Sequence, residues 1–340
     1  MRKLALLLGS VLIGLLAAEG LVRLLHAAPE IGWVQIGRFR LSHNPKIGFE
    51  PVPGMVASEL TNDLVDFTGA ANNLGFRDRD HAVRKPPGVF RIVVLGDSVG
   101  TGLKVARLED VFPFQLEAIL RRAGVNAEVI NLSVTGYSTQ QEVETLREKG
   151  LRFSPDLVLV AYTLSDRERL DGNIMETLLS AARMGPARFE RRANPILVKS
   201  ALYRLFFFRV FAPRAKSGDE SKQFERALAA ISGDTVAPSF AALRALARER
   251  NFRVLVAVFP YFAGLSRGYA FRAEHASARA EAEKNGFEVV DLLAPMQRCR
   301  KESRRRINYD SFHPNETGHR CAAEAMAPAI RHLLERKPAG

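Results

Sequence analysis

The sequence contains little cysteine, and its two residues, Cys299 and Cys321, exclude several classes of protein. Two thiols cannot build a disulfide-dense scaffold or a four-thiolate zinc site, although they can form one bridge or none. The seven histidines are scattered without the spacing of a ligand set, so no metal and no cofactor is expected. A mean hydropathy of -0.07 over 340 residues also argues against more than one membrane segment.

The composition is otherwise that of a globular protein, with 47% apolar and 25% charged residues, and the length suits one large domain or two smaller ones. The net charge of +12 is concentrated in two patches. Residues 183–216 contain nine basic residues and one acidic residue, and residues 298–306 contain six and one. Patches of this kind suit an anionic membrane surface, an acidic polymer or nucleic acid.

The N-terminus has the pattern of a segment that meets a membrane. Arg2 and Lys3 precede fifteen uncharged residues, 4–18, and the apolar character continues to Leu25. Residues 1–26 therefore predict an uncleaved signal anchor, a cleaved signal peptide or, as a third reading, a buried core helix. In the first two cases the rest of the chain is exported, with Arg2 and Lys3 left on the cytoplasmic side. Export would permit a bridge between the two cysteines.

The exported part divides at about residue 88. Residues 27–88 contain repeated Pro and Gly, which predicts a linker and irregular packing against the main domain. Residues 89–340 alternate short apolar segments with helical ones, apart from an insertion at 170–235. The predicted strands are 90–95, 127–132, 156–162, 252–259 and 287–292, and the predicted helices are 108–123, 139–149, 239–249, 275–284 and 316–335. This alternation predicts an α/β fold whose parallel sheet is covered on both faces.

Chemically useful residues follow the predicted strands, where open sheets bind their ligands. A serine becomes nucleophilic when a histidine, oriented by a carboxylate, takes its proton. Asp310 and His313 are three residues apart, so one turn can aim both at the sheet edge. Each motif alone is also a common turn or helix start, but together they predict acyl chemistry. The segments concerned are Gly96-Asp97-Ser98, Asn131 with Thr135-Gly136-Tyr137, Ser165-Asp166, and Asp310-Ser311-Phe312-His313-Pro314.

These motifs resemble those of the SGNH/GDSL family of serine esterases and acylhydrolases. The resemblance covers residues 72–166 and 287–335 but not the insertion. It implies a three-layer α/β/α sandwich with a flavodoxin-like parallel sheet, in which Ser98 is the nucleophile, His313 the base and Asp310 its orienting carboxylate. The matching blocks are Val93 to Ser98, Val129 to Gly136 and Asp310 to Asn315, while Asn72 to Arg77 and Pro155 to Val158 resemble the membrane-anchored bacterial branch.

The resemblance also implies an oxyanion hole formed by the backbone N–H groups of Ser98 and Gly136. The family's third donor is the Asn of a Gly-x-Asn-Asp block, and Ser165 stands at that position here. Either the shorter Ser165 hydroxyl donates, or another group such as Asn131 compensates, or the enzyme is slow. We expect retained but modest activity. Asp97 is expected to cap the turn below the nucleophile rather than to take part in the chemistry.

Residues 201–211, ALYRLFFFRVF, set two arginines among aromatic residues inside the insertion. They predict either a lid or membrane-surface helix, or a helix packed over the sheet edge whose arginines reach water. Among the other histidines, His319 is expected at the surface or behind the site, and His275 has no evident partner.

The sequence as a whole predicts a serine esterase, anchored to the inner membrane of a bacterial cell envelope, that removes acyl groups such as acetyl from a glycan or lipid. The alternatives are an O-acetyltransferase that acts on a polysaccharide with the same triad, and a weakly catalytic module that binds an acylated glycan. Export makes nucleic acid an unsuitable partner, so the basic patches favour an anionic substrate or lipid headgroups. The base must be neutral to accept the serine proton, so activity should fall below about pH 6–7.

Overall fold

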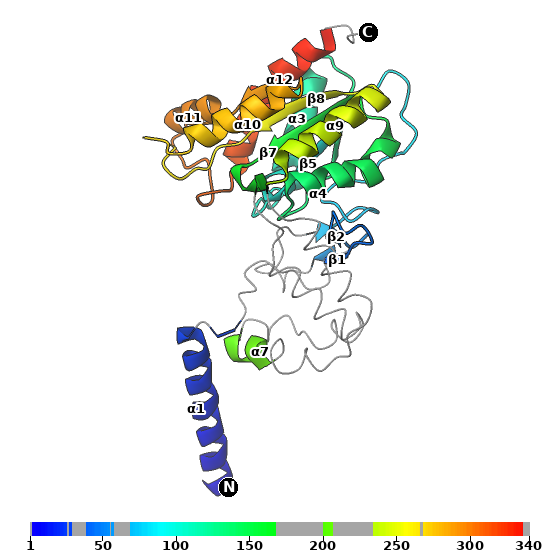
Figure 1. Cartoon of the computed structure of the whole chain (residues 1–340). Coiled ribbons are helices and arrows are strands. Elements are labelled where there is room, and N and C mark those ends of the chain that lie inside the picture. Colours follow the sequence, from blue (N-terminus) through cyan, green and yellow to red (C-terminus); the bar gives the residue numbers. More distant parts are fainter. Residues whose placement is uncertain are drawn as a thin grey trace.

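The centre of the fold is a five-stranded parallel sheet (Figure 1). The computed structural model of the chain describes residues 2–25, 27–28, 39–54, 56–57, 69–167, 200–206, 234–265 and 268–335. The strands follow the order β6-β5-β7-β8-β9, which is the flavodoxin-like order and confirms the predicted fold class. Their bounds are β5 (Phe90–Gly96), β6 (Ala127–Asn131), β7 (Leu157–Tyr162), β8 (Arg253–Val258) and β9 (Glu288–Asp291).

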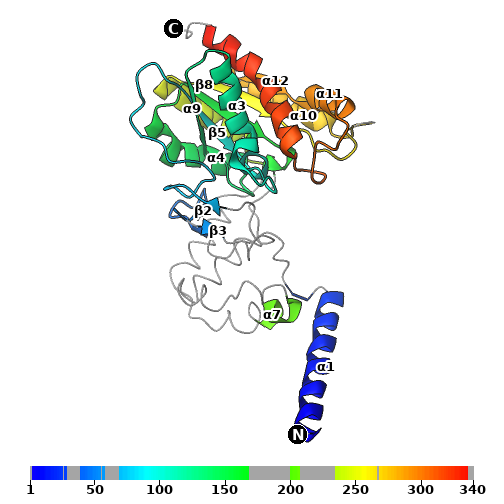
Figure 2. The same cartoon turned by 180° about the vertical axis from the view of Figure 1, so that it is seen from behind.

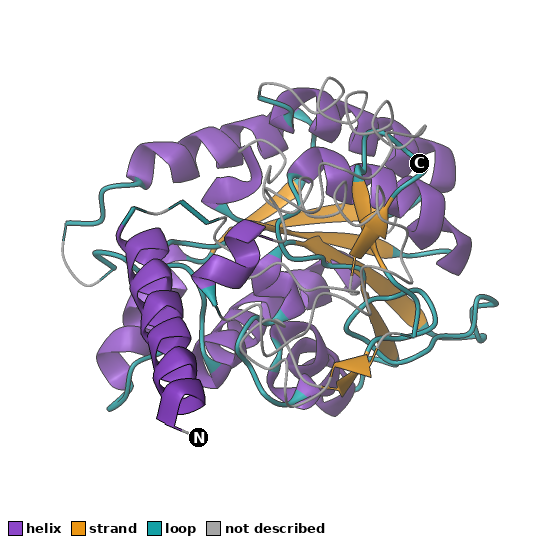
Figure 3. Ribbon diagram, turned by 90° about the horizontal axis from the view of Figure 1, so that it is seen from below, coloured by secondary structure: helices purple, strands orange, loops and turns teal. Residues whose placement is uncertain are grey.

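Helices cover both faces of the sheet, because its inner strands are apolar on both sides (Figures 2 and 3). In β5, Val93 and Leu95 join one core and Ile92 and Val94 join the other. One core is closed by α4 (Thr139–Thr145), α9 (Val236–Arg250) and α10 (Arg272–Lys284). The other is closed by α3 (Phe112–Arg122), α11 (Leu293–Glu302) and α12 (Glu316–Glu335).

Three helical segments differ from the prediction. Residues 108–123 form a short 3₁₀ turn, Leu108–Asp110, and then α3, since Pro113 has no N–H and suits only the first turn of a helix. Residues 139–149 form α4 followed by a π-helical turn at Leu146–Gly150. Helix α11 was not predicted, because half of its residues are charged or polar and it shows little apolar periodicity.

Two small antiparallel pairs precede the main sheet, β1 (Phe39–Leu41) with β2 (Phe49–Pro51) and β3 (Val56–Ala57) with β4 (Gly69–Ala70). The first pair packs on the α4 side of the sheet. The Phe49 ring meets the Tyr137 ring edge to face at 5.2 Å, and the Tyr137 hydroxyl donates to the Phe49 carbonyl at 2.6 Å. Part of the predicted linker therefore contributes to the core of the domain.

The apolar helix α1 (Arg2–Leu24) lies at the end of the molecule opposite to the main sheet (Figure 1). Its segment Leu6–Leu24 has a mean hydropathy of 1.8 and is only 6% buried, so by length and composition it could cross a membrane. The short helix α7 (Ala201–Leu205) lies beside it. The rest of the predicted insertion up to residue 233, including almost all of the basic patch at 183–216, lies outside the described residues.

A disulfide joins α11 to α12. Cys299 and Cys321 are bonded, with their Cα atoms 6.3 Å apart and a sequence separation of 22. The sequence left open whether the two cysteines form a bridge, and in the structure they do. A disulfide is typical of a protein that leaves the reducing cytoplasm.

Candidate active site

Ser98 is the first residue of α2 (Ser98–Thr101), a single helical turn directly after β5. Asp97 caps this turn, because its Oδ1 accepts a hydrogen bond from the N–H of Val99 at 2.8 Å. The predicted capping role of Asp97 is therefore confirmed. The strand order reverses at β5, with β6 on one side and β7 on the other. Open α/β sheets bind ligands at such a switch point, and the half-buried Ser98 lies there.

Asp310 and His313 lie on a tight loop between α11 and α12. The N–H of Tyr309 donates to the His313 carbonyl at 2.9 Å, which closes the loop at its base. Inside the loop, Asp310 Oδ1 accepts hydrogen bonds from the N–H groups of Phe312 and His313, both at 2.9 Å. This turn places both side chains on the side that faces α2.

The three side chains form a continuous hydrogen-bonded chain. Ser98 Oγ lies 3.0 Å from His313 Nε2, across 215 positions of sequence. His313 Nδ1 lies 2.9 Å from Asp310 Oδ1 and 3.0 Å from Oδ2. Partial burial raises the pKa of Asp310, but hydrogen bonds from Lys104, His313 and two backbone N–H groups outweigh it and hold that pKa well below its usual range. The ionised carboxylate can therefore orient the His313 ring with Nε2 free to accept a proton from Ser98.

Behind Ser98 lies a group of buried acids that sequence reasoning did not anticipate. The Thr163 hydroxyl is 2.9 Å from Asp97 Oδ2 and 2.9 Å from Asp166 Oδ1. Burial raises the pKa of Asp97 despite these contacts. Glu142 on α4 is also buried, and neither of its carboxyl oxygens has a hydrogen-bond partner among the described residues. Burial together with the charges of Asp166 and Asp97 raises the pKa of Glu142 well above the usual value.

The candidate oxyanion donors are two backbone groups. The N–H groups of Ser98 and Gly136 take no part in the turn and loop hydrogen bonds of the described residues. Gly136 has a φ of 81°, which a residue with a side chain rarely adopts. The segment after β6 is held along β5, since the N–H of Val134 donates to the Gly96 carbonyl at 2.9 Å. This contact brings Gly136 to the edge of the sheet where Ser98 lies.

The side chains considered as a third donor are engaged elsewhere. The Ser165 hydroxyl lies 2.8 Å from Thr163 Oγ1 and donates to Asp97 Oδ2 at 3.4 Å. The Asn131 amide donates to the Gly100 carbonyl at 3.0 Å, behind α2. Asn131 therefore supports the turn of Ser98 from behind, which argues against its use as a compensating oxyanion donor.

Two further histidines have structural partners. His319 is fully buried, accepts a hydrogen bond from the N–H of Phe112 at 3.2 Å, and its ring stacks on that of Phe112. Burial, with the charges of Arg77 and His313, lowers the pKa of His319 to about 3, so it is neutral. Of the two positions expected for His319, the one at the surface is excluded by its burial. His275 has partners that the sequence did not reveal: Asp291 at 2.8 Å and the Tyr269 hydroxyl at 3.1 Å.

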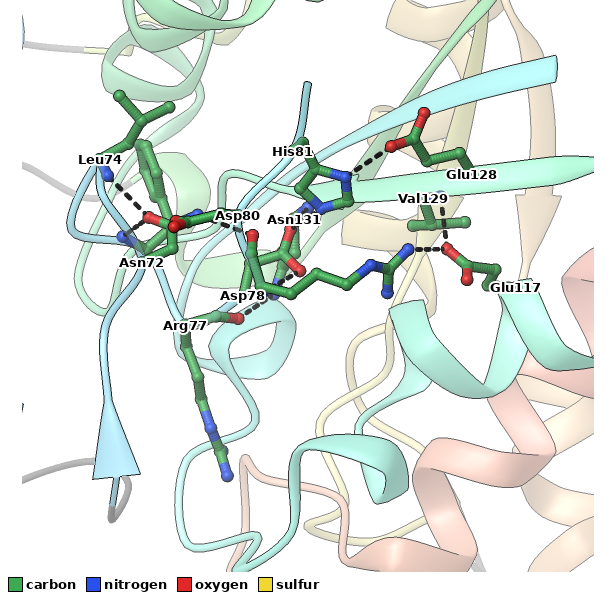
Figure 4. Close-up of polar contacts among 12 residues, drawn as sticks. Asn72, Leu74, Arg77, Asp78, Asp80, His81, Glu117, Glu128, Val129 and Asn131 are labelled. Carbon is green, nitrogen blue, oxygen red and sulfur yellow. Dashed lines mark hydrogen bonds and ion pairs between the residues drawn. The ribbon is translucent and has the colours of Figure 1, made fainter. Parts of the chain in front are cut away.

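The segment before β5 is tied to β6 by a polar network (Figure 4). Asp78 Oδ2 accepts from the N–H of Asn131 at 2.7 Å and lies 3.0 Å from His81 Nε2. His81 Nδ1 lies 2.8 Å from Glu128, which also accepts from Arg91 at 2.7 Å. Burial lowers the pKa of His81, but Asp78 and Glu128 outweigh this and raise it.

Within the described part of the chain, no group of three or more His, Cys, Asp or Glu side chains is arranged to hold a metal ion.

The fold and the chemistry at its carboxyl edge are those of a hydrolase. A family model described as the GDSL-like lipase/acylhydrolase family matches residues 94–321, more than half of the chain. The chain belongs to this family and is an ester hydrolase. The match includes Ser98, Asp310 and His313, and it confirms the resemblance seen in the sequence motifs.

Solved structures with similar folds include three esterases or acylhydrolases, all distant in sequence. The lipase/acylhydrolase from Enterococcus faecalis is 16% identical, with a TM-score of 0.44 and coverage of 74% of this chain and 98% of its own. The acetyl xylan esterase AlAXEase is 15% identical, with a TM-score of 0.42 and coverage of 71% and 99%. The esterase EstA from Pseudoalteromonas sp. is 13% identical, with a TM-score of 0.42 and coverage of 73% and 100%. No curated protein sequence matches the chain.

Proposed function

We propose that this ester hydrolase is a serine esterase that uses Ser98, His313 and Asp310 as its triad. Ser98 Oγ attacks the ester carbonyl carbon while His313 Nε2 takes the serine proton. The alcohol then leaves with that proton, and a water molecule, activated by the same nitrogen, releases the acyl group from Ser98. The observation that carries the proposal is the hydrogen-bonded chain from Ser98 through His313 to an ionised Asp310.

In this proposal the developing oxyanion is held by two backbone donors, the N–H groups of Ser98 and Gly136. Their freedom from other hydrogen bonds among the described residues supports this role. Ser165 contributes less, because its hydroxyl is directed to Thr163 and Asp97. A hole with two donors rather than three is expected to give a slower enzyme, since one donor is worth on the order of 10²–10³ in rate.

The enzyme is proposed to stay anchored to the inner membrane of a bacterial envelope, with its domain outside the cytoplasm. Four donors surround the Glu19 carboxylate of α1: Arg23 at 2.7 Å, the Ser200 hydroxyl at 2.7 Å, and the N–H groups of Ala201 and Leu202 at 2.9 and 2.8 Å. Three of these belong to the start of α7. A carboxylate in an apolar helix is costly unless it is paired, so these contacts favour retention of α1 in the mature protein.

Retention of α1 can be tested by the intact mass of the protein extracted from membranes. A mass that includes residues 1–26 is expected. A mature N-terminus near Glu19 would instead identify α1 as a cleaved signal peptide and contradict the anchor.

The substrate is proposed to be an acylated and anionic glycan or lipid. The basic patch at 298–306 ends four residues before Asp310, and five of its six basic side chains are exposed. The ion pairs found among the described residues include none from this patch. An amide hydrogen bond of 2.7 Å from Asn315 to the Arg306 carbonyl fixes the patch beside the loop of His313. This position supports a role of the patch in attracting an anionic substrate toward the proposed triad.

A serine-directed fluorophosphonate probe on the full-length protein tests the proposal. We expect the wild type to be labelled, Ser98→Ala to be unlabelled, and Ser311→Ala, a matched serine on the same edge, to be labelled normally. Hydrolysis of 4-nitrophenyl acetate should follow the labelling. Absence of labelling in the wild type, or labelling that survives in Ser98→Ala, would refute the assignment; the former result would favour a glycan-binding module. Acetyl appearing on an added oligosaccharide rather than in water would identify an O-acetyltransferase.

A further inference from the structure

A cation from the loop after α2 contacts the carboxylate of the proposed triad. Lys104 Nζ donates to Asp310 Oδ2 at 2.7 Å, across 206 positions of sequence. The other oxygen, Oδ1, is held by the N–H groups of Phe312 and His313 and by His313 Nδ1. Lys104 therefore supplies the only hydrogen bond to Oδ2, among the described residues, that does not come from His313.

The backbone around Lys104 is shaped to present this side chain. Lys104 has a φ of 68° and lies two residues after Gly102, which has a φ of 76° and ends α2. A residue with a Cβ rarely adopts such a φ, so the conformation needs support from its surroundings. Val105, the next residue, is buried, and its N–H donates to the Gly102 carbonyl at 3.0 Å.

The support comes from Arg77, in the segment that precedes the sheet. Its guanidinium is buried and donates to four carbonyls of this loop. The partners are Thr101 at 3.1 Å, Gly102 at 2.7 Å, Val105 at 2.6 Å and Ala106 at 3.3 Å. A planar group with five fixed donors suits this task better than a lysine would. Arg77 thereby fixes the backbone on both sides of Lys104.

We propose that Lys104 is a positioning residue of the triad, which acts through Asp310, and that Arg77 braces the loop that presents it. This inference rests on the proposed function of Ser98, His313 and Asp310. By bonding Oδ2, Lys104 stops the carboxylate from rotating away from His313. Its positive charge also opposes the binding of a proton by the His313–Asp310 pair.

The other charged groups near the pair do not duplicate this role. Asp97 lies below Ser98 and carries the opposite sign when ionised. Arg77 has its guanidinium committed to the loop carbonyls. His319 is buried and neutral, as its pKa of about 3 requires. Lys104 is thus the cation that contacts the carboxylate itself.

The test compares Lys104→Gln and Lys104→Arg with the wild type in the full-length protein. The measured quantity is kcat/KM for 4-nitrophenyl acetate between pH 5 and 9. We expect Lys104→Gln to move the acid limb of the profile to higher pH by about 0.5 unit, since a nearby positive charge is lost. Activity at pH 7 should fall about threefold to tenfold, and Lys104→Arg should restore most of both effects.

The matched control is Lys85→Gln, which removes another Lys–Asp contact of 2.7 Å, to Asp156, away from the site. It should leave the pH profile unchanged. An acid limb of Lys104→Gln that coincides with the wild type, or an equal shift in Lys85→Gln, would overturn the inference. Failure of the proposed function is distinguishable, because it would leave the wild type without Ser98-dependent hydrolysis.

Discussion

The buried Glu142 gives a prediction about how stability depends on pH. In the part of the chain that the structure describes, both of its carboxyl oxygens lack a hydrogen-bond partner, and burial with the charges of Asp166 and Asp97 raises its pKa well above the usual value. In the unfolded chain this carboxyl loses its proton near pH 4.3. Above that pH the folded state holds a proton that the unfolded state has released, so the wild type loses stability as the pH rises.

The perturbation that tests this is Glu142→Gln, which keeps the shape of the side chain and removes its titration. At pH 5 the variant should already be more stable by roughly 1 kcal/mol, because that pH lies above the value at which the unfolded carboxyl ionises. The free energy of unfolding of the variant should then exceed that of the wild type by up to about 1.4 kcal/mol for each further pH unit over which folded Glu142 stays protonated. Each 1 kcal/mol corresponds to roughly 2–4 °C in Tm for a domain of this size.

The assay is thermal unfolding of the full-length protein in mild detergent at pH 5, 6, 7 and 8. The control is Glu144→Gln on the same helix, where the carboxylate has Arg147 at 3.4 Å and Lys46 at 3.8 Å. This variant should gain nothing as the pH rises. A Tm difference between Glu142→Gln and the wild type that stays constant from pH 5 to 8 would refute the reasoning.

Three further predictions concern the disulfide, the third oxyanion position at Ser165 and the turn of Ser98. Replacing Cys299 and Cys321 by alanine should lower the free energy of unfolding by about 3 kcal/mol, because the disulfide no longer closes a loop of 22 positions in the unfolded chain. Urea unfolding measures the loss, and a loss below about 1 kcal/mol would contradict the expectation. Ser165→Asn should raise kcat for a model ester by roughly tenfold or more if the missing third donor limits the rate, and an unchanged kcat rejects that limit. Gly100→Ala places a Cβ 2.0 Å from Ser133 Oγ. The substitution should lower the free energy of unfolding by about 1–3 kcal/mol and slow the fluorophosphonate labelling of Ser98. A normal rate of labelling would show that the turn accommodates the added methyl group.

The sequence predicted the sheet well, because five apolar strand segments separated by helical ones permit few other folds. It also predicted which residues meet at the carboxyl edge. Ser98, Asp310 and His313 are of residue types whose chemistry is specific, and Ser98 follows a strand end. The loop between α11 and α12 brings His313 within 3.0 Å of Ser98 and within 3.0 Å of Asp310.

The residues that support the site were not predictable in the same way. Lys104 is one lysine among many, and only the left-handed backbone of its loop directs it to Asp310. Glu142 lies on a helix with polar neighbours in sequence, which gave no sign that its face is buried. His319 was expected at the surface or behind the site, and its position along the helix did not decide between the two. The positions of all three side chains depend on contacts between segments that are far apart in the sequence. The residue pattern of a single strand or helix does not reveal such contacts.

The disulfide has a consequence for when the triad is assembled. Asp310 and His313 both lie between Cys299 and Cys321, so the base and its carboxylate are enclosed in one covalent ring, while Ser98 lies outside it. Cytoplasmic thiols are kept reduced, so in an exported protein of the kind we propose this ring closes only after the chain has crossed the membrane. The proposed base and carboxylate would then reach their final order in the same compartment as the proposed substrate.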